Sequence, residues 1–190
     1  MRSAFVIILL IFSLRSHGQA NLKPIDSTQL LAGIRLAKGV ESHFIGCYGS
    51  HSALHANVDS LINLIGRPAF ESYFFDTSHI LKYYAFLSIL EVNEHLAFER
   101  LQQIIHDSSE IDYEFAGQNR GSEKFNALLA FHYYQFIKWK YYHGGHLAHD
   151  GKLYIFPRRG KKEWKAKKKL VNSLLGQNNV DTRLIQIYVQ

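Results

Sequence analysis

The sequence predicts an all-α domain, and three observations carry that prediction. Apolar residues recur at helical spacing along most of the chain, cap residues precede several of these stretches, and no alternation of strand and helix patterns is present. The composition is 47% hydrophobic and 20% charged over 190 residues, which is typical of one globular domain. It excludes a coiled-coil rod, a collagen-like fibre, a disulfide-stapled miniprotein and a polytopic membrane protein.

The first twenty residues are typical of a secretory signal peptide. Arg2 begins a short basic region, an apolar run follows over 4–14, and the segment ends on Gly18 and Ala20, the small residues that a signal peptidase reads. The run is too short for a spanning helix. We expect residues 1–20 to be removed, and 21–190 to be an exported single domain, periplasmic or extracellular. The alternative is an uncleaved N-terminal anchor.

Helical spacing and cap signals place the elements in order. The expected helices cover about 26–37, 54–65, 78–91, 93–106, 122–140 and 161–175. Between them we expect an ordered loop near 41–52, a polar connection over 108–121 and an irregular Gly-rich segment over 143–160. Two segments stay open: 152–156 fits a short strand or extended chain, and 183–189 fits a strand or a helix.

The two helices expected over 77–106 have a very short linker, which predicts an antiparallel hairpin. The stretch from Phe70 through the Asp76–Ser78 cap to Leu90, followed by Ala97–Leu101, resembles a HEAT-type helical repeat. The sequence is also similar to exported bacterial proteins of unknown function that place a Gly-Cys-aromatic-Gly loop, here 46–49, ahead of such hairpins. This resemblance covers roughly residues 44–140. It implies a binding scaffold and carries no catalytic residues.

Positive charge is concentrated in one segment near the C-terminus. Residues 138–169 hold 11 basic and 2 acidic side chains, whereas 21–137 hold 8 basic and 13 acidic. Such a segment attracts nucleic acid, anionic lipid or an acidic polymer, or is simply a solvated helix face. We do not expect nucleic acid to be the partner, because an exported protein rarely meets it. Trp164, Leu170, Val171, Leu174 and Leu175 are expected to form the apolar stripe of this helix.

Aromatic residues are dense just before the basic segment. They exceed what one helix face can bury, so some rings are expected to pack beneath the 143–160 segment or to contact a partner. The predicted binding surface consists of Tyr133, Tyr134, Tyr141, Tyr142, Arg158, Arg159, Lys161, Lys162 and Lys165.

Three histidines and an aspartate form the strongest metal candidate. His143, His146, His149 and Asp150 are spaced three residues apart or adjacent, and imidazole with carboxylate is suitable chemistry for zinc. A small zinc-dependent hydrolase is therefore the alternative function. The two glycines between the first two histidines favour a polar surface loop instead.

Two weaker candidates complete the set. The single cysteine, Cys47, lies four residues from both His43 and His51, and a thiolate beside an imidazole is the pattern of a nucleophile. This spacing brings the side chains together only on a helix, which the neighbouring glycines disfavour. Glu110, Asp112 and Glu114 alternate and would point the same way in an extended segment, as in a cation site or a solvated loop. No phosphate-binding loop, His-Glu-x-x-His or Gly-x-Ser-x-Gly motif is present.

The sequence therefore favours an exported, non-enzymatic helical scaffold or interaction module without a cofactor. Its expected partner is a protein or an anionic envelope polymer, bound beside the basic segment. The enzyme class stays open through the histidine cluster.

Overall fold

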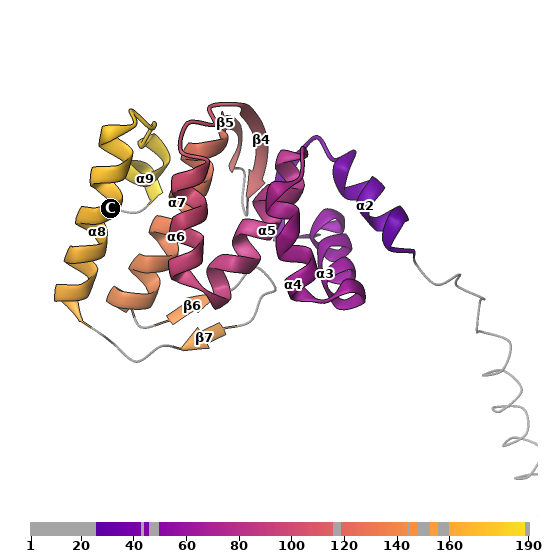
Figure 1. Ribbon diagram of the computed structural model, residues 1–190, viewed down its shortest axis with the longest axis horizontal. Helices are drawn as coiled ribbons and strands as arrows, with labels where there is room; N and C mark the ends of the chain where they lie inside the picture. The colour runs from indigo at the N-terminus through magenta and orange to yellow at the C-terminus, as the bar shows by residue number, and fades with distance from the viewer. Residues whose placement is uncertain are drawn as a thin grey trace, which may run out of the picture.

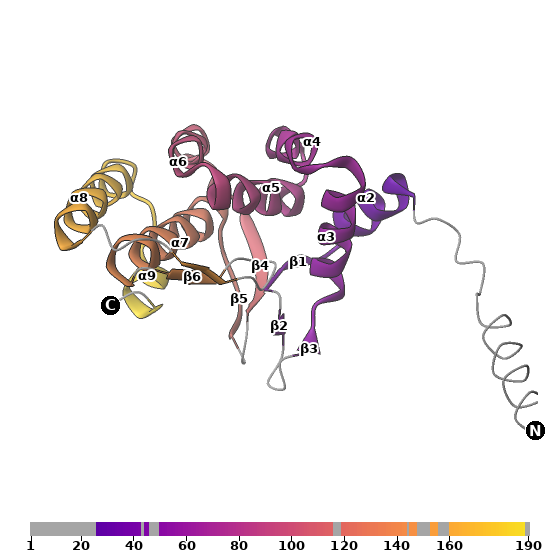
Figure 2. The same ribbon diagram turned by 90° about the horizontal axis from the view of Figure 1, so that it is seen from below.

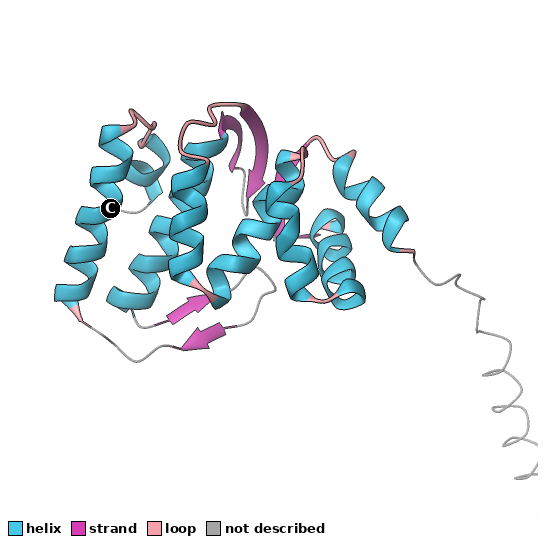
Figure 3. Ribbon diagram, in the orientation of Figure 1, coloured by secondary structure: helices cyan, strands magenta, loops and turns pink. Residues whose placement is uncertain are grey.

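The computed structural model describes residues 26–42, 44–45, 50–115, 119–143, 145–147, 153–155 and 160–188. Over these residues the chain is mostly helical with short strands added, which confirms the predicted all-α class (Figure 3). The helices are α2 (Ser27–Arg35), α3 (Ala53–Ile65), α4 (Arg67–Glu71), α5 (His79–Val92), α6 (Glu94–Gln103), α7 (Phe125–Lys138), α8 (Lys161–Gln177) and α9 (Arg183–Tyr188), with a 3₁₀ turn η1 (Ser72–Phe75) and a π-helical turn η2 (Trp139–His143). The strands are β1 (Gly39–Glu41), β2 (Phe44–Ile45), β3 (Ser50–His51), β4 (Glu110–Phe115), β5 (Asn119–Lys124), β6 (Gly145–Leu147) and β7 (Leu153–Ile155).

Side-chain caps fix the starts of several predicted helices, whereas α7 and α8 begin without one. Asp26, Ser52 and Ser78 each accept a hydrogen bond from a backbone N–H in the first turn of α2, α3 and α5, respectively.

The structure also decides the secondary structure of the two segments, 152–156 and 183–189, for which the sequence allowed two possibilities. Residues 183–188 form helix α9, and β7 places a short strand within 152–156.

Helix α5 is the centre of the fold, and buried residues lie on all sides of it. Figure 2 shows α4 and α6 on one side of it and the strands β1 and β4 on the other. Its buried residues, Ile80, Leu81, Tyr83, Tyr84, Ala85, Phe86, Ser88, Ile89 and Leu90, therefore point in all directions. A helix largely surrounded by neighbours lacks a continuous polar face, because only Val92 at its end is exposed and Lys82 and Glu91 are partly so.

Helices α5 and α6 form the predicted pair over 77–106. Only Asn93 separates them, and its side chain accepts a hydrogen bond from the N–H of Leu96 to cap α6. In Figure 1 the two helices meet at one end and diverge as a V. The resemblance of the pair to a HEAT-type repeat stays a prediction.

The polar connection predicted over 108–121 is wrong, because strands β4 and β5 form an antiparallel hairpin there. Tyr113 pairs with Gly121 in its register, and β1 joins β4 in parallel with Val40 beside Tyr113. These three strands form one sheet in the order β1-β4-β5, with β4 in the middle. Along β4 the acidic residues alternate with apolar ones, as expected of a strand. Ile111 is buried, and Tyr113 and Phe115 are half-buried.

The last two helices, α8 and α9, pack on helix α7, most of which is buried. Figure 1 places α8 at one end of the molecule and α2 at the opposite end. Among the described residues, no helix combines the length and apolar character that a bilayer crossing requires.

Candidate functional site: the basic face of helix α8

The exposed side of α8 is a lysine surface. The helix packs on the domain through buried Val171 and Leu175, with Trp164 and Leu174 half-buried beside them. The lysines on its outer surface are all exposed: Lys161, Lys162, Lys165, Lys168 and Lys169. We call these five residues the α8 lysine face. Their separations of three, four and seven residues place them as neighbours along about 12 Å of helix.

One residue of the predicted apolar stripe is misplaced. Leu170 is 49% exposed, whereas Lys167 is half-buried in its stead. The helical period explains the exchange. Lys167 lies three residues after Trp164 and shares its inward face, whereas Leu170 lies six residues after Trp164 and is turned away from the domain.

Lys167 differs from the lysine face because it pairs with a buried carboxylate. Its Nζ lies 2.7 Å from Oε1 of Glu94, at the start of α6. Lys140 and Tyr141 donate to the other carboxylate oxygen at 2.8 and 2.7 Å. Burial alone would raise the pKa of Glu94, but these three donors outweigh it and hold the pKa below its ordinary value. Glu94 therefore joins α6, η2 and α8.

The α8 lysine face has no such partner in the described part of the chain. The ion pairs there engage Lys140 and Lys167 but none of the five lysines, and the one ring near the face is Trp164, whose centre is 5.9 Å from Nζ of Lys168. Lys165, Lys168 and Lys169 also line a shallow depression of about 500 Å³ together with Asn172 and Ser173. The charge of this face is thus directed at solvent and at any ligand.

Three of the four predicted binding tyrosines are core residues, which corrects the expectation that they face a partner. Tyr133, Tyr134 and Tyr141 are 6% exposed or less. Helix α7 is covered by α5, α6, α8 and α9, so its rings pack against these neighbours. Tyr134, for example, meets the edge of Trp164 at 5.4 Å between ring centres. Tyr142 is 44% exposed at the end of the same segment.

The remaining predicted residues fall partly outside the described chain. Arg158, Arg159, His149, Asp150 and Cys47 lie outside it, as does His43. The backbones of His143 and His146 belong to η2 and β6, where His146 pairs with Tyr154. Within the residues that the structure does describe, no group of three or more His, Cys, Asp or Glu side chains could hold a metal ion. Zinc binding by the histidine cluster stays a prediction.

The predicted acidic run occupies one strand. Glu110, Asp112 and Glu114 alternate along β4 as expected, and Glu114 is paired with Arg120 at 2.7 Å. This pairing neutralises the most buried of the three carboxylates, and the run does not gather into a cation site among the described residues.

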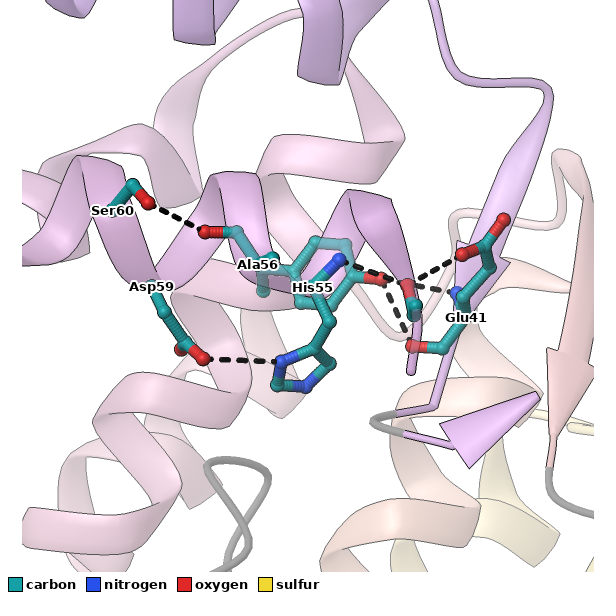
Figure 4. Close-up of polar contacts among 7 residues, drawn as sticks. Glu41, His55, Ala56, Asp59 and Ser60 are labelled. Carbon is teal, nitrogen blue, oxygen red and sulfur yellow. Dashed lines mark hydrogen bonds and ion pairs between the residues drawn. The ribbon is translucent and has the colours of Figure 1, made fainter. Parts of the chain in front are cut away.

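A polar cluster that sequence reasoning missed lies between β1, α3 and α5. Ser52 donates from its hydroxyl to Glu41, and its oxygen accepts the backbone N–H of His55 at 2.9 Å. Nδ1 of the His55 ring lies 3.6 Å from Asp59. Figure 4 shows this ring directed at Asp59 and away from Glu41.

The chemistry of this cluster is structural. A serine nucleophile needs an imidazole nitrogen at its hydroxyl, but here the hydroxyl is bonded to a carboxylate and the ring faces Asp59. Ser52 and His55 are also 2% and 1% exposed, so a substrate could not reach either group. The pairing of His55 with Asp59 could be predicted from their helical spacing of four residues. The contact of Ser52 with Glu41 could not, because it depends on how β1 packs in the fold.

In comparisons with family models, curated proteins and solved structures, the chain matches none of them.

Proposed function

We propose that this protein is an exported, non-enzymatic interaction module that binds an anionic macromolecule through the α8 lysine face. The single observation that carries the proposal is the contrast between Lys167, which is paired with Glu94, and the five exposed lysines on the same helix. The pairing of Lys167 with the buried Glu94 carboxylate helps to hold α8 on the domain, with the five other lysines on its outer surface.

Charge complementarity supports an anionic partner. An array of ammonium groups on neighbouring helical turns gives a positive potential that attracts carboxylate, sulfate or phosphate groups. The export signal over residues 1–20 directs the search to periplasmic or extracellular partners, namely acidic proteins and envelope polymers. The HEAT-type resemblance of the central hairpin is in keeping with a binding scaffold.

The experiment compares two charge-reversal variants of equal net charge. The first variant reverses the charge of three of the five lysines of the α8 lysine face, by Lys161→Glu, Lys162→Glu and Lys165→Glu. In the control, Lys38→Glu, Lys82→Glu and Lys124→Glu reverse three lysines that lie outside α8. Binding of each protein to fluorescent polygalacturonate and polyglutamate is measured by anisotropy.

We expect the α8 variant to lose affinity for a polyanion at least tenfold more than the control variant does, as the loss of several close charge contacts requires. Equal losses in the two variants would show that net charge alone governs binding, and would overturn the proposal. So would a wild-type protein that binds neither polymer.

A further inference from the structure

A second feature adjoins the α8 lysine face: a groove of about 630 Å³ where α7, α8 and α9 meet. Its floor is apolar, and its rim is polar. The floor residues, Tyr134, Leu175, Val180 and Ile185, are all buried. The rim consists of Lys168, Asn172, Gly176, Asn179, Thr182 and Gln186. Because Lys168 and Asn172 also line the lysine depression, the two surfaces are continuous.

The end of α8 builds this groove. Val180 donates its N–H to the carbonyl of Leu175 at 3.0 Å, and Asn179 donates to Gly176 at 3.4 Å. This pattern is a Schellman motif, which turns the chain so that Val180 packs back on Leu175. Asn179 provides the left-handed residue with φ of 52°, and its exposed side chain lies on the rim.

The groove offers a consistent set of ligand-binding groups. Its rim contains amides, a hydroxyl and one ammonium group, and no carboxylate. Amides and hydroxyls donate to and accept from neutral polar groups, whereas the ammonium group binds an anion. The apolar floor suits a ligand with C–H surfaces, and the volume lies within the range of small-ligand pockets.

Sugar units have this combination of hydroxyl edges and C–H faces. We propose that the anionic macromolecule is an acidic polysaccharide, with a sugar unit in the groove and its acidic groups along the α8 lysine face. This inference rests on the proposed function. A single-stranded nucleic acid fits the groove less well, because base stacking needs an exposed ring and Tyr134 is only 3% exposed. An acidic polypeptide is an outcome of the test.

The test removes two of the three rim amides, at positions chosen to leave the fold undisturbed. Asn179→Gly keeps the left-handed position, which glycine adopts most readily, and Gln186→Ala suits its helical position. The matched control is Gln29→Ala with Gln102→Ala, which removes two exposed amides elsewhere. Affinities for polygalacturonate and for polyglutamate are measured by anisotropy, and thermal unfolding verifies that each variant is folded.

We expect the double groove variant to bind polygalacturonate about tenfold more weakly, as the loss of two hydrogen bonds requires, with polyglutamate affinity changed less than about twofold. The control variant should match the wild type for both polymers. Equal effects on both polymers, no effect on either, or tighter wild-type binding to polyglutamate would overturn the polysaccharide assignment. The charge-reversal variant distinguishes the two proposals, since its failure to weaken binding overturns the lysine face itself.

Discussion

The hydroxyl of Tyr84 is bonded to both backbone groups of Glu41. It accepts the N–H of Glu41 at 3.0 Å and donates to the carbonyl of Glu41 at 2.9 Å. Strand β1 lies at the edge of the sheet, and the N–H of Ser42 bonds to the carbonyl of Glu114 on the other side. The Tyr84 hydroxyl therefore makes the hydrogen bonds that a neighbouring strand would otherwise make with Glu41 at this edge. Burial raises the pKa of this hydroxyl far above neutrality, so it stays protonated and able to donate.

Tyr84→Phe should lower the free energy of unfolding by about 1–3 kcal/mol, because it leaves two backbone groups of Glu41 without their partner. Chemical denaturation measures the change. Tyr73→Phe is the control, since the Tyr73 hydroxyl has no hydrogen bond in the described chain. Similar destabilisation by both substitutions would contradict the role of the Tyr84 hydroxyl.

Gly39→Ala should destabilise the protein by about 1–3 kcal/mol through overpacking. A Cβ at Gly39 would lie 2.4 Å from the backbone oxygen of Asp112, where β1 pairs with β4. Gly33→Ala, by contrast, should stabilise α2 by about 0.4–1 kcal/mol, since the nearest atom is 3.9 Å away. Denaturation midpoints of the two variants should therefore move in opposite directions, and a shared direction would contradict this packing.

Glu94→Gln should cost about 1.5–3 kcal/mol at neutral pH by weakening charge-assisted hydrogen bonds from Lys140, Lys167 and Tyr141. Because the folded pKa lies below the ordinary value of 4.5, the stabilisation is present above that pH and is lost as pH falls through the folded pKa. Thermal unfolding of the wild type and the variant should therefore converge in acid.

The matched control for this pH dependence is Glu99→Gln on the same helix. Glu99 is half-exposed and pairs with the exposed His95, so its replacement should change stability little. A stability difference between Glu94→Gln and the wild type that stays constant through acid would contradict the linkage.

The export prediction has a direct check. When the full chain is produced in a secreting bacterial host, the exported protein should begin at Asn21 by N-terminal sequencing, because cleavage is expected after Ala20. A protein that retains Met1 would favour the uncleaved anchor instead.

The longer helices α2, α3, α5, α6, α7 and α8 were predictable because their determinants are local, whereas the sequence did not predict the short α4 and allowed either a strand or a helix for α9. Ser78 and Asn93 mark the starts of α5 and α6 by capping, and the spacing of Val171 and Leu175 marks the inner face of α8. The β4–β5 hairpin was missed because Glu110, Asp112 and Glu114 give it the composition of a loop, whereas its stability depends on distant contacts of Phe115 with α7.

The candidate site was only half predictable for the same reason. Exposure of Lys161, Lys162 and Lys165 follows from the helical period of one segment. The burial of Tyr134 depends on α8 and α9 covering α7, and Tyr133 packs on Phe98 of α6. The groove combines residues of three helices, and no local pattern brings these together.

The central claim is that the α8 lysine face binds a polyanion by charge. The most direct measurement is the salt dependence of polygalacturonate binding between about 0.05 and 0.5 M salt, for the wild type and for Lys161→Glu with Lys162→Glu and Lys165→Glu. Wild-type affinity should fall steeply with salt, and the variant should be weaker and less sensitive to salt. Binding that is independent of salt, or equally sensitive in both proteins, would contradict the claim.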